Sequence, residues 1–296
     1  MQNKPSVAVL MTCHNRSAKT LRALHHLFRQ QDASCRMAVY LVDDGCTDDT
    51  PQRVAAKHPE VRLIAGDGTL YWGGGTARAF AAARDVGHDF YLWLNDDTFL
   101  FEDALRRLLA TYREVRASSA ADCIIVGSTR SETGTKANTG GRRSSRWRPF
   151  RFDIVEPGHF PRQCATFNGN CVLIPCRVAE AVGSLDPTFR HYIGDIDYGL
   201  RARESGFQSW VAPGFVATCE VGRGKPVDLR GPRDVLRILP QLGNPKGVNL
   251  PGGTLYSFRE WAHFASRHGG PLWFVYFALP YRRLLKGLIS WTHHRA

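Results

Sequence analysis

The chain has 296 residues, of which 43% are hydrophobic and 22% are charged, and this composition excludes a disordered chain. Its 39 Lys and Arg residues against 27 Asp and Glu residues give a net charge of +12, which favours an anionic partner: a nucleic acid, an anionic membrane or an anionic small molecule. The 8 cysteines are scattered and no secretory signal opens the chain, so we expect reduced thiols in a cytoplasmic protein.

Apolar runs alternate with helical patterns over the first 115 residues. Strands are predicted at 6–11, 38–42, 61–64 and 91–94, and helices at 18–30, 50–57, 76–86 and 102–115. This alternation predicts an α/β fold in which helices cover both faces of a mostly parallel, Rossmann-like sheet. Because such folds bind ligands at the carboxyl ends of their strands, we expect one edge of the sheet to gather Thr12, Asp43, Asp44, Asn95, Asp96 and Asp97.

A glycine-rich segment, residues 66–75, separates the third strand from the next helix. Glycines such as Gly68 and Gly74 let the backbone approach a ligand, and the N-terminus of the following helix favours a phosphate. Arg78, one turn into that helix, is a candidate to reach a diphosphate. The pattern is neither the G-x-G-x-x-G of dinucleotide binders nor a P-loop. Trp72 either supports a sugar ring or belongs to the core.

The fourth strand ends at Asn95, Asp96 and Asp97. Two adjacent carboxylates repel each other unless a cation lies beside them, and Mg²⁺ or Mn²⁺ prefers such oxygen ligands. We therefore predict that Asp97, together with Asn95 or Asp96, holds a divalent metal and its diphosphate. Asp97 and Asn95 are the expected metal ligands, and Asp96 is assigned to the donor nucleotide. The alternative is that the carboxylates cap the helix that follows.

The second half of the chain is less regular. Strands are predicted at 124–127, 165–174 and 207–216, and a turn followed by a helix at 189–204. Between the first two strands, residues 136–151 are rich in Arg, Gly and Ser, which favours a mobile basic loop over a helix that reads a nucleic-acid groove. A helix is predicted from about residue 257.

The C-terminal part ends in an apolar run, residues 271–280, that is shorter than the roughly 20 residues needed to span a bilayer. Arg282, Arg283 and Lys286 follow it. Aromatic residues next to cations suit a helix that lies on an anionic membrane, which would place the protein at the inner face of the cytoplasmic membrane. A helix packed on the domain, with solvated basic residues, is the alternative.

Four segments resemble, in this order, the motifs of family 2 glycosyltransferases with the GT-A fold: Thr12–Arg16, Val42–Asp48, Leu94–Asp97 and Gly194–Arg203. The resemblance covers about residues 6–220, and the glycine-rich segment is similar to that of the rhamnosyl- and galactosyltransferase-like branch. It implies a glycosyltransferase domain at 1–225, with a nucleotide-binding half (1–100) and an acceptor half (101–225), followed by a C-terminal helical extension (226–296).

The resemblance also implies an inverting, metal-dependent enzyme that moves a sugar from a UDP- or dTDP-sugar to a glycan or lipid-linked saccharide. Its first two motifs bind the nucleoside, which assigns Thr12, Asn15, Asp43 and Asp44 to the donor. The residues agree with this assignment, because a carboxylate accepts the N3–H of a pyrimidine and Thr12 can bond the base or the ribose. The third motif is the D-x-D-type metal site.

The fourth motif implies that Asp195 is the catalytic base, which takes a proton from the acceptor hydroxyl. Family members usually have Glu-Asp here, whereas this chain has Gly194 before Asp195. His191, Tyr192, Asp197 and Trp72 are candidates for the acceptor site. Asp197 also lies four residues before Arg201, where a helix would pair the two charges.

The third protein ligand of the predicted metal stays open. Many relatives place a His after the last strand, where this chain has Cys219 and Glu220. Glu220 offers an oxygen ligand, Cys219 suits Mg²⁺ poorly, and His263 and His268 are further alternatives.

Three other functions compete with this interpretation. A sugar-phosphate nucleotidyltransferase would carry a glycine-rich first loop, and Thr12–Arg16 has no glycine. A non-catalytic nucleic-acid-binding protein is suggested by charge alone, without an RRM, helix-turn-helix or finger signature, so we expect no nucleic acid partner. A degenerate transferase would have lost the carboxylates Asp96, Asp97 and Asp195, which this chain retains.

Overall fold

A computed structural model describes residues 4–30, 35–119, 121–145, 150–220, 225–229, 231–251 and 253–289. Residues 146–149 of the predicted basic loop and residues 290–296 of the predicted C-terminal segment lie outside this description.

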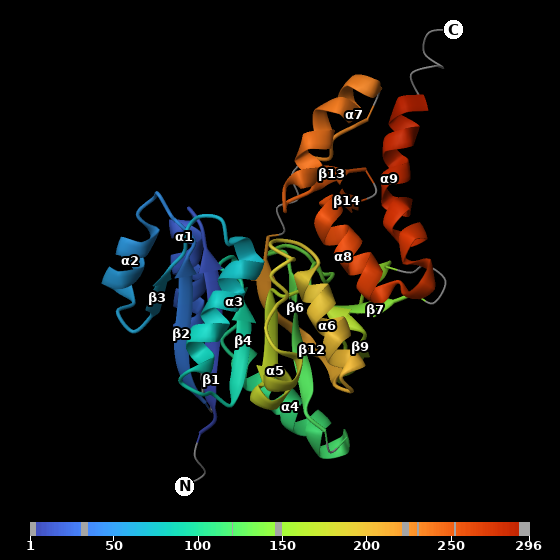
Figure 1. Cartoon of the computed structure of the whole chain (residues 1–296). Coiled ribbons are helices and arrows are strands. Elements are labelled where there is room, and N and C mark those ends of the chain that lie inside the picture. Colours follow the sequence, from blue (N-terminus) through green and yellow to red (C-terminus); the bar gives the residue numbers. More distant parts are fainter. Residues whose placement is uncertain are drawn as a thin grey trace.

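A nine-stranded sheet runs through the described residues in the order β3-β2-β1-β4-β11-β6-β12-β5, and β9 pairs with β12 (Figure 1). Its strands are β1 (Ser6–Cys13), β2 (Arg36–Asp43), β3 (Arg62–Ala65), β4 (Phe90–Leu94), β5 (Thr98–Leu100), β6 (Cys123–Arg130), β9 (Arg162–Cys164), β11 (Cys171–Pro175) and β12 (Gln208–Cys219). The first four strands in this order are parallel, β11 is antiparallel to both neighbours, and β12 is parallel to β6.

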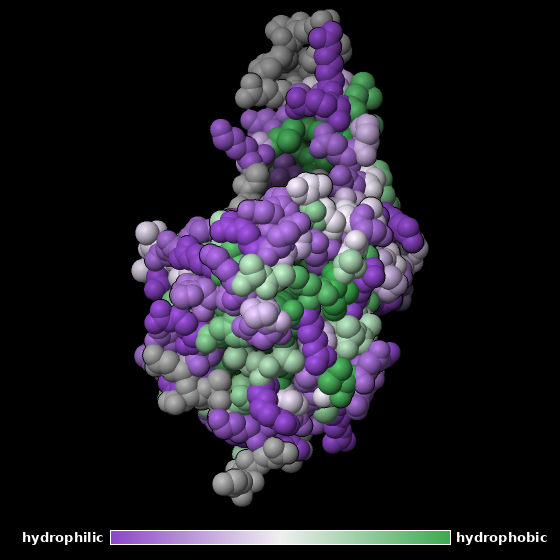
Figure 2. All heavy atoms as spheres, turned by 90° about the vertical axis from the view of Figure 1, so that its left-hand side faces the viewer, coloured by the Kyte–Doolittle hydropathy of each residue, from purple (hydrophilic) through white to green (hydrophobic). Residues whose placement is uncertain are grey.

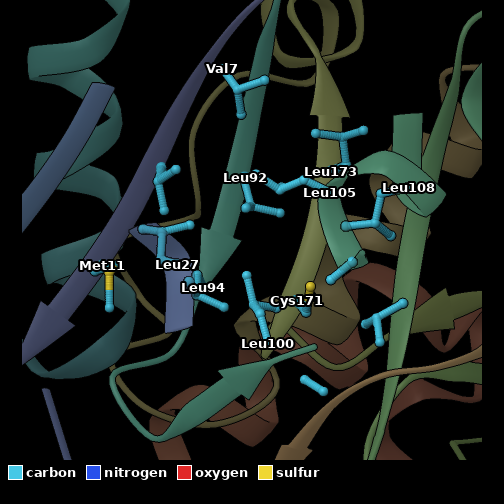
Figure 3. Close-up of a cluster of buried hydrophobic side chains, with 14 of the residues drawn as sticks. Val7, Met11, Leu27, Leu92, Leu94, Leu100, Leu105, Leu108, Cys171 and Leu173 are labelled. Carbon is cyan, nitrogen blue, oxygen red and sulfur yellow. The ribbon is translucent and has the colours of Figure 1, made fainter. Parts of the chain in front are cut away.

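Helices cover both faces of this sheet, which confirms the predicted α/β class. Side chains alternate along β1, so Val7, Val9 and Met11 pack on one face while Ala8 and Leu10 pack on the other. The first face meets α1 (Ser17–Phe28), α2 (Thr50–Lys57) and α4 (Ala104–Ser119), and Figure 3 shows part of that core. The second face meets α3 (Tyr71–Arg84), α5 (Cys176–Val182) and α6 (Gly194–Glu204).

Several elements differ from the predictions. The strand predicted at 165–174 is two strands, β10 (Thr166–Phe167) and β11, separated by a turn at 168–170. The predicted basic loop contains β7 (Gly141–Ser144), which pairs with β10 and with β8 (Phe152–Ile154) in a second sheet. Helix α3 begins at Tyr71 rather than Thr76, so Gly73, Gly74 and Gly75 lie near its N-terminus, while Gly66 and Gly68 precede it.

The C-terminal part is mainly helical, as predicted, and also contains a hairpin. Its elements are α7 (Pro232–Ile238), η1 (Leu239–Gly243), β13 (Val248–Leu250), β14 (Gly253–Leu255), α8 (Phe258–His268), η2 (Gly270–Leu272) and α9 (Trp273–Ile289). It projects from the body of the molecule in Figure 1 and Figure 2. Trp261 and Phe264 of α8 join Phe189, Ile193 and Ile196 in one apolar cluster, which fixes this part against the start of α6. Among the described helices, none has the length and apolar content needed to cross a bilayer.

Candidate active site

The carboxyl ends of β1, β2 and β4 lie side by side, as the sequence predicts. The parallel pairing puts Thr12 opposite Val42 and Cys13 opposite Asp43, while Leu10 pairs with Trp93 of β4. Residues that leave these strands therefore meet at one edge of the sheet, and this edge is the candidate site.

Arg16 neutralises the two adjacent carboxylates. Its Nη1 atom donates to Asp96 Oδ1 at 3.2 Å and to Asp97 Oδ2 at 2.9 Å. Asp96 is buried, and burial raises its pKa to about 6 although Arg16 opposes the shift. The other oxygen of Asp96, Oδ2, is buried without a hydrogen-bond partner among the described residues. Arg16 belongs to the first motif, but sequence reasoning did not assign it to the site.

Asp97 offers a hard carboxylate ligand, and the candidate third ligands, Cys219 and Glu220, have different surroundings. Cys219 lies close because β12 pairs with β5, and its Sγ is 3.8 Å from Asp97 Oδ1. Glu220 accepts a hydrogen bond from the backbone N–H of Glu132 at 2.9 Å. Within the described ranges Asp97 belongs to no group of three His, Cys or carboxylate ligands. The carboxylate of Asp97 suits Mg²⁺ or Mn²⁺, which would take waters and phosphate oxygens as further ligands.

His263 and His268, the alternative ligands, do not face Asp97. His263 contacts Asp186 at 2.9 Å, and His268 contacts Asp197 at 2.9 Å. Both therefore belong to a charged network that contacts Asp186 and Asp197 of the α6 region, rather than to the edge of the sheet.

Asp44 shapes the glycine-rich loop. Its buried carboxylate accepts backbone N–H bonds from Gly68 at 2.9 Å, Leu70 at 3.2 Å and Tyr71 at 2.8 Å. Asp43 remains half-buried, with Oδ1 accepting from the backbone N–H of Cys46 at 2.8 Å. The carboxylate of Asp44 is thus used to start α3, and Asp43 is the better placed of the two to meet a ligand.

Asn15 and Thr12 occupy different environments in the first motif. Asn15 adopts a left-handed backbone (φ 51°), and its Oδ1 accepts from the backbone N–H groups of Thr47 and Asp48 at 2.7 and 3.1 Å. It thereby ties the loop after β1 to the loop after β2. The hydroxyl of Thr12 is buried without a partner among the described residues, beside Gly75 at the start of α3. An unpaired buried hydroxyl at this edge is suited to bond a ligand.

The glycines of α3 let it approach the loop before α6. The N–H of Gly73 donates to the backbone oxygen of Arg190 at 2.8 Å, and a Cβ at Gly73 would lie 2.2 Å from the oxygen of Phe189. Gly74 faces no such backbone contact, since its nearest neighbour would be Leu70 Cβ at 3.2 Å. Arg78, further along α3, is exposed.

Trp72 contacts both Asn95 of the third motif and the turn that bonds Asp195, the predicted base. Its Nε1 donates to Asn95 Oδ1 at 2.8 Å, so that oxygen of the predicted metal ligand is already bonded. A Cβ at Gly169 would lie 2.4 Å from the Trp72 ring, and the N–H of Gly169 donates to Asp195 Oδ2 at 2.8 Å. The N–H of Asn95 also donates to the oxygen of Asn170 at 3.1 Å.

The turn at 168–170 is therefore part of the site, and sequence reasoning missed it. Its three residues, Asn168, Gly169 and Asn170, form a polar triplet inside an otherwise apolar stretch. Asn-Gly pairs favour turns, so this signal was present in the sequence.

Asp195 is a carboxylate whose two oxygens each accept a backbone hydrogen bond. It lies in the first turn of α6, after Ile193, which has a left-handed backbone (φ 56°). Its Oδ1 accepts from the backbone N–H of Ile196 at 2.8 Å. Burial raises its pKa, while the N–H groups of Gly169 and Ile196 and the charge of Arg142 partly oppose the shift. A carboxylate with a raised pKa accepts a proton more readily.

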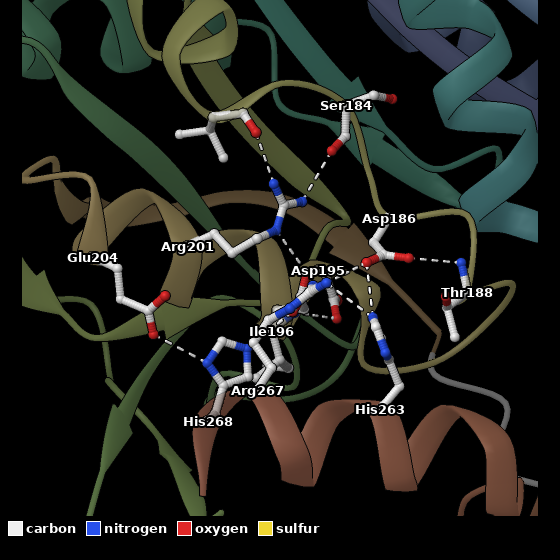
Figure 4. Close-up of polar contacts among 12 residues, drawn as sticks. Ser184, Asp186, Thr188, Asp195, Ile196, Arg201, Glu204, His263, Arg267 and His268 are labelled. Atoms are coloured by element: carbon white, nitrogen blue, oxygen red, sulfur yellow. Dashed lines mark hydrogen bonds and ion pairs between the residues drawn. The ribbon is translucent and has the colours of Figure 1, made fainter. Parts of the chain in front are cut away.

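Asp197 has a scaffold position. It is fully buried, and it accepts from Arg201 at 2.8 Å, as the spacing predicts, from Arg267 at 2.8 Å and from His268 at 2.9 Å. Figure 4 labels these three donors. Such a carboxylate is held by three donors and has no exposed surface for an acceptor sugar.

Four side chains lie beside the start of α3: those of His191 and Tyr192, and the cations of Arg190 and Lys246. Burial, together with the charges of Lys246 and Arg16, lowers the pKa of His191 to about 4, so its imidazole is neutral at pH 7. Tyr192 is exposed and its ring is 4.5 Å from that of His191. Arg190 and Lys246 lie over the Tyr71 ring at 5.4 and 6.0 Å. Lys246 comes from the C-terminal part, so no local pattern could have assigned it to the site.

The sequence profile described as Glycosyl transferase family 2 matches residues 8–182, more than half of the chain. Two curated proteins from two strains of Mycobacterium tuberculosis, both named N-acetylglucosaminyl-diphospho-decaprenol L-rhamnosyltransferase, are each 27% identical to this chain over 199 residues. These matches cover 60% of this chain and 64% of each relative, so the chain spans less than two thirds of their length.

Among solved structures, the crystal structure of S. aureus TarS matches with a TM-score of 0.56 and 13% sequence identity. The match covers 88% of this chain and 42% of that chain. At this identity the likeness concerns the fold, and it agrees with the GT-A fold predicted from the sequence.

Proposed function

The chain belongs to glycosyltransferase family 2, and from this premise we propose that it transfers a sugar from a UDP- or dTDP-sugar to a saccharide acceptor with inversion at the anomeric carbon. The observation that carries the proposal is the contact chain from Asn95 through Trp72 and Gly169 to Asp195. It supports a donor site and a proton acceptor that lie within one continuous set of contacts.

In this proposal Asp43 and the Thr12 hydroxyl bind the nucleoside, because one is a half-buried carboxylate and the other an unpaired hydroxyl at the same edge. The N-terminal turn of α3, with Gly74, faces the diphosphate, and Arg78 reaches it from the following turn. Arg16 lies at the same edge and is oriented there by the buried Asp96. Asn15, Asp44 and Gly68 hold the loops that shape this site.

Asp97 would hold Mg²⁺ or Mn²⁺, with Arg16 moving from its carboxylate toward the diphosphate. When bound, such an ion neutralises charge on the leaving diphosphate. Asp195 takes the proton of the acceptor hydroxyl, and the upward shift of its pKa strengthens it as a base. The neutral imidazole of His191 and the exposed ring of Tyr192 would contact the acceptor sugar.

The acceptor is proposed to be a lipid-linked saccharide at an anionic membrane. The curated relatives are named for rhamnosyl transfer to a diphospho-decaprenol-linked sugar. Helix α9 and the preceding turn expose large apolar side chains: Leu272, Trp273, Phe274, Val275, Leu279 and Leu285. Val275, Leu279 and Arg282 share one side of α9 by their spacing, which combines apolar and basic groups as an interfacial helix requires.

The proposal retains residues 1–225 as the transferase domain, with halves at 1–100 and 101–225, and residues 226–296 as the extension that contacts the membrane. Family membership favours sugar transfer over nucleotidyl transfer. The expectation that nucleic acid is not a partner stays a prediction, which a duplex titration beside the experiment below would test.

The proposal is tested by titrating the protein with UDP and with dTDP in a calorimeter, first with Mn²⁺ or Mg²⁺ and then with a chelator. We expect binding that the chelator and Asp97→Ala each weaken by about 100-fold or more, as the loss of a charged contact worth about 3 kcal/mol would do. Asp85→Ala, which removes an exposed carboxylate after the end of α3, is the matched control and should bind as the natural chain does. An absence of binding to both nucleotides would refute the proposal.

A further inference from the structure

Three side chains with metal-ligating atoms lie together beside the nucleoside residues. Cys13 ends β1, Asp43 ends β2, and Cys46 lies in the turn that follows. Their ligand atoms all lie within 4.8 Å of one another. The strand pairing puts Cys13 opposite Asp43, and the left-handed backbone of Gly45 (φ 65°) returns the chain so that Cys46 meets both.

Backbone hydrogen bonds fix this arrangement. The N–H of Cys46 donates to Asp43 Oδ1 at 2.8 Å, and the N–H of Asn15 donates to Cys46 Sγ at 3.2 Å. The thiols of Cys13 and Cys46 are also hydrogen-bonded to each other. An N–H group directed at sulfur stabilises a thiolate, so the polypeptide already supplies an outer contact of the kind that orients metal ligands. Cys13 is buried and Cys46 is half-buried, which leaves the group accessible through Cys46.

The geometry matches a small tetrahedral ion. With Zn–S distances of about 2.3 Å and a Zn–O distance of about 2.0 Å, the two sulfurs would lie about 3.8 Å apart and each about 3.5 Å from the oxygen. Ligand atoms that already lie within 4.8 Å need shifts of about 1 Å to reach this arrangement. Thiolates select soft cations, whereas the carboxylates at Asp97 suit Mg²⁺ or Mn²⁺.

We propose that Cys13, Asp43 and Cys46 form a second metal site, which binds a thiophilic divalent cation such as Zn²⁺ or Cd²⁺. Two thiolates and one carboxylate would hold the ion, and water would fill the fourth position. Binding displaces the thiol protons into solvent, which is necessary here because burial raises the pKa of Cys46 to about 11.

An ion in this site would compete with the donor nucleotide. This second part rests on the proposed function, in which Asp43 binds the nucleoside. Coordination would draw the negative charge of Asp43 toward the ion and occupy one of its two oxygens, while Oδ1 already accepts from the N–H of Cys46. Asp43 would then be a weaker acceptor for the N3–H of a pyrimidine, so a thiophilic ion should act as an inhibitor at the nucleoside end of the site.

The site itself is tested with Cd²⁺ and the reduced full-length protein, by following the ultraviolet absorption of the thiolate–Cd²⁺ bond. We expect one bound Cd²⁺ per chain in the natural protein and in Cys176→Ser, a control at the other half-buried thiol. Cys46→Ser and Cys13→Ser should each bind Cd²⁺ more than about 100-fold more weakly, beyond the 10- to 100-fold effect of losing an outer contact. An unchanged signal in Cys46→Ser, or no signal in the natural chain, would overturn the site.

The competition is tested by repeating the UDP titration, with Mn²⁺ present, after one equivalent of Cd²⁺ has been added. UDP affinity should fall at least about tenfold in the natural protein and stay unchanged in Cys46→Ser. Equal loss in both proteins would place the effect at Asp97 and contradict competition at Asp43. If UDP does not bind before Cd²⁺ is added, the proposed function fails, while the thiolate absorption still decides whether the second site exists.

Discussion

Glu260 is a buried carboxylate that contacts the loop before α6. It is 2% exposed, and its Oε1 accepts from the backbone N–H of Arg190 at 3.2 Å. The other oxygen, Oε2, is buried without a hydrogen-bond partner in the part of the chain that the structure describes. Burial raises its pKa from 4.5 to about 7, although the nearby Arg190 opposes the shift. This residue therefore ionises in the folded protein near neutral pH.

Replacing Glu260 should change how stability depends on pH. Because its folded pKa lies above its unfolded value, the stability contributed by the neutral carboxyl is complete below about pH 4.5 and is lost as the pH rises through about 7. Glu260→Gln keeps an acceptor for Arg190 without the charge. Urea unfolding should show equal stability near pH 4.5 and a gain of up to about 3 kcal/mol for the variant at about pH 8.

The control for this experiment is Glu114→Gln, on the exposed side of α4. It should follow the natural chain at every pH. A Glu260→Gln variant whose stability also parallels the natural chain would show that folding does not shift the pKa of Glu260.

At the scale of elements, two neighbouring glycines at the start of α3 differ in what they contact: Gly73 packs on the backbone of residues 189–190, and Gly74 does not. A Cβ at Gly73 would overlap the oxygen of Phe189 at 2.2 Å, so Gly73→Ala should destabilise the protein by about 2–4 kcal/mol. Gly74→Ala meets only the side chain of Leu70 and should lie within about 1 kcal/mol of the natural chain, because Ala favours a helix. Thermal unfolding of the two variants makes the comparison, and equal losses would contradict it.

Long periodic elements could be predicted from the sequence, whereas contacts between distant segments could not. The strands ending near Thr12, Asp43 and Leu94 were predicted because their apolar runs are unambiguous. The start of α3 was placed too late because glycines disfavour helices, while Asp44 stabilises that turn from another strand end. β5, at three residues, is too short to show any periodicity.

The candidate site follows the same division. The edge that gathers Thr12, Asp43 and Asp97 was predicted, because parallel strands share their carboxyl ends. The sequence did not reveal that Asp44 and Asp197 hold the fold together rather than meet a ligand. Their hydrogen-bond partners come from segments remote in sequence. Arg16 lies within the first motif, but its contact with Asp97 could not be predicted, because that contact depends on the pairing of β1 with β4.

At the scale of the whole molecule, α8 connects the C-terminal part to the helix that carries the proposed base. Arg267 donates to Asp186 at 2.5 Å (Figure 4) and to Asp197 at 2.8 Å. Hydrogen bonds from His263, Thr188 and Arg267 lower the pKa of Asp186 although burial opposes them. The position of α6 thus depends on residues that come about 70 positions later in the chain.

The proposed membrane contact of α9 predicts a defined loss on one substitution. The full-length protein should sediment with vesicles of phosphatidylcholine and phosphatidylglycerol, and less with phosphatidylcholine alone. Phe274→Glu, at a side chain that is 55% exposed, should weaken binding at least about tenfold, because burying Phe contributes about 2 kcal/mol. Val86→Glu, also at a 55% exposed side chain, lies just after α3 and should bind normally. Equal binding by Phe274→Glu and Val86→Glu would refute the contact.

The buried carboxylate Asp197 also limits how this protein can be recombined with its relatives. Its partners Arg267 and His268 belong to the C-terminal part, and removing the cations from a buried charge costs about 3–5 kcal/mol. A chimera that exchanges everything after residue 225 would leave Asp186 and Asp197 facing foreign side chains. A folded hybrid is expected only when the relative that supplies the C-terminal part carries a matching pair of cations at the end of its α8. The transferase domain and the C-terminal part should therefore be exchangeable only as a matched pair.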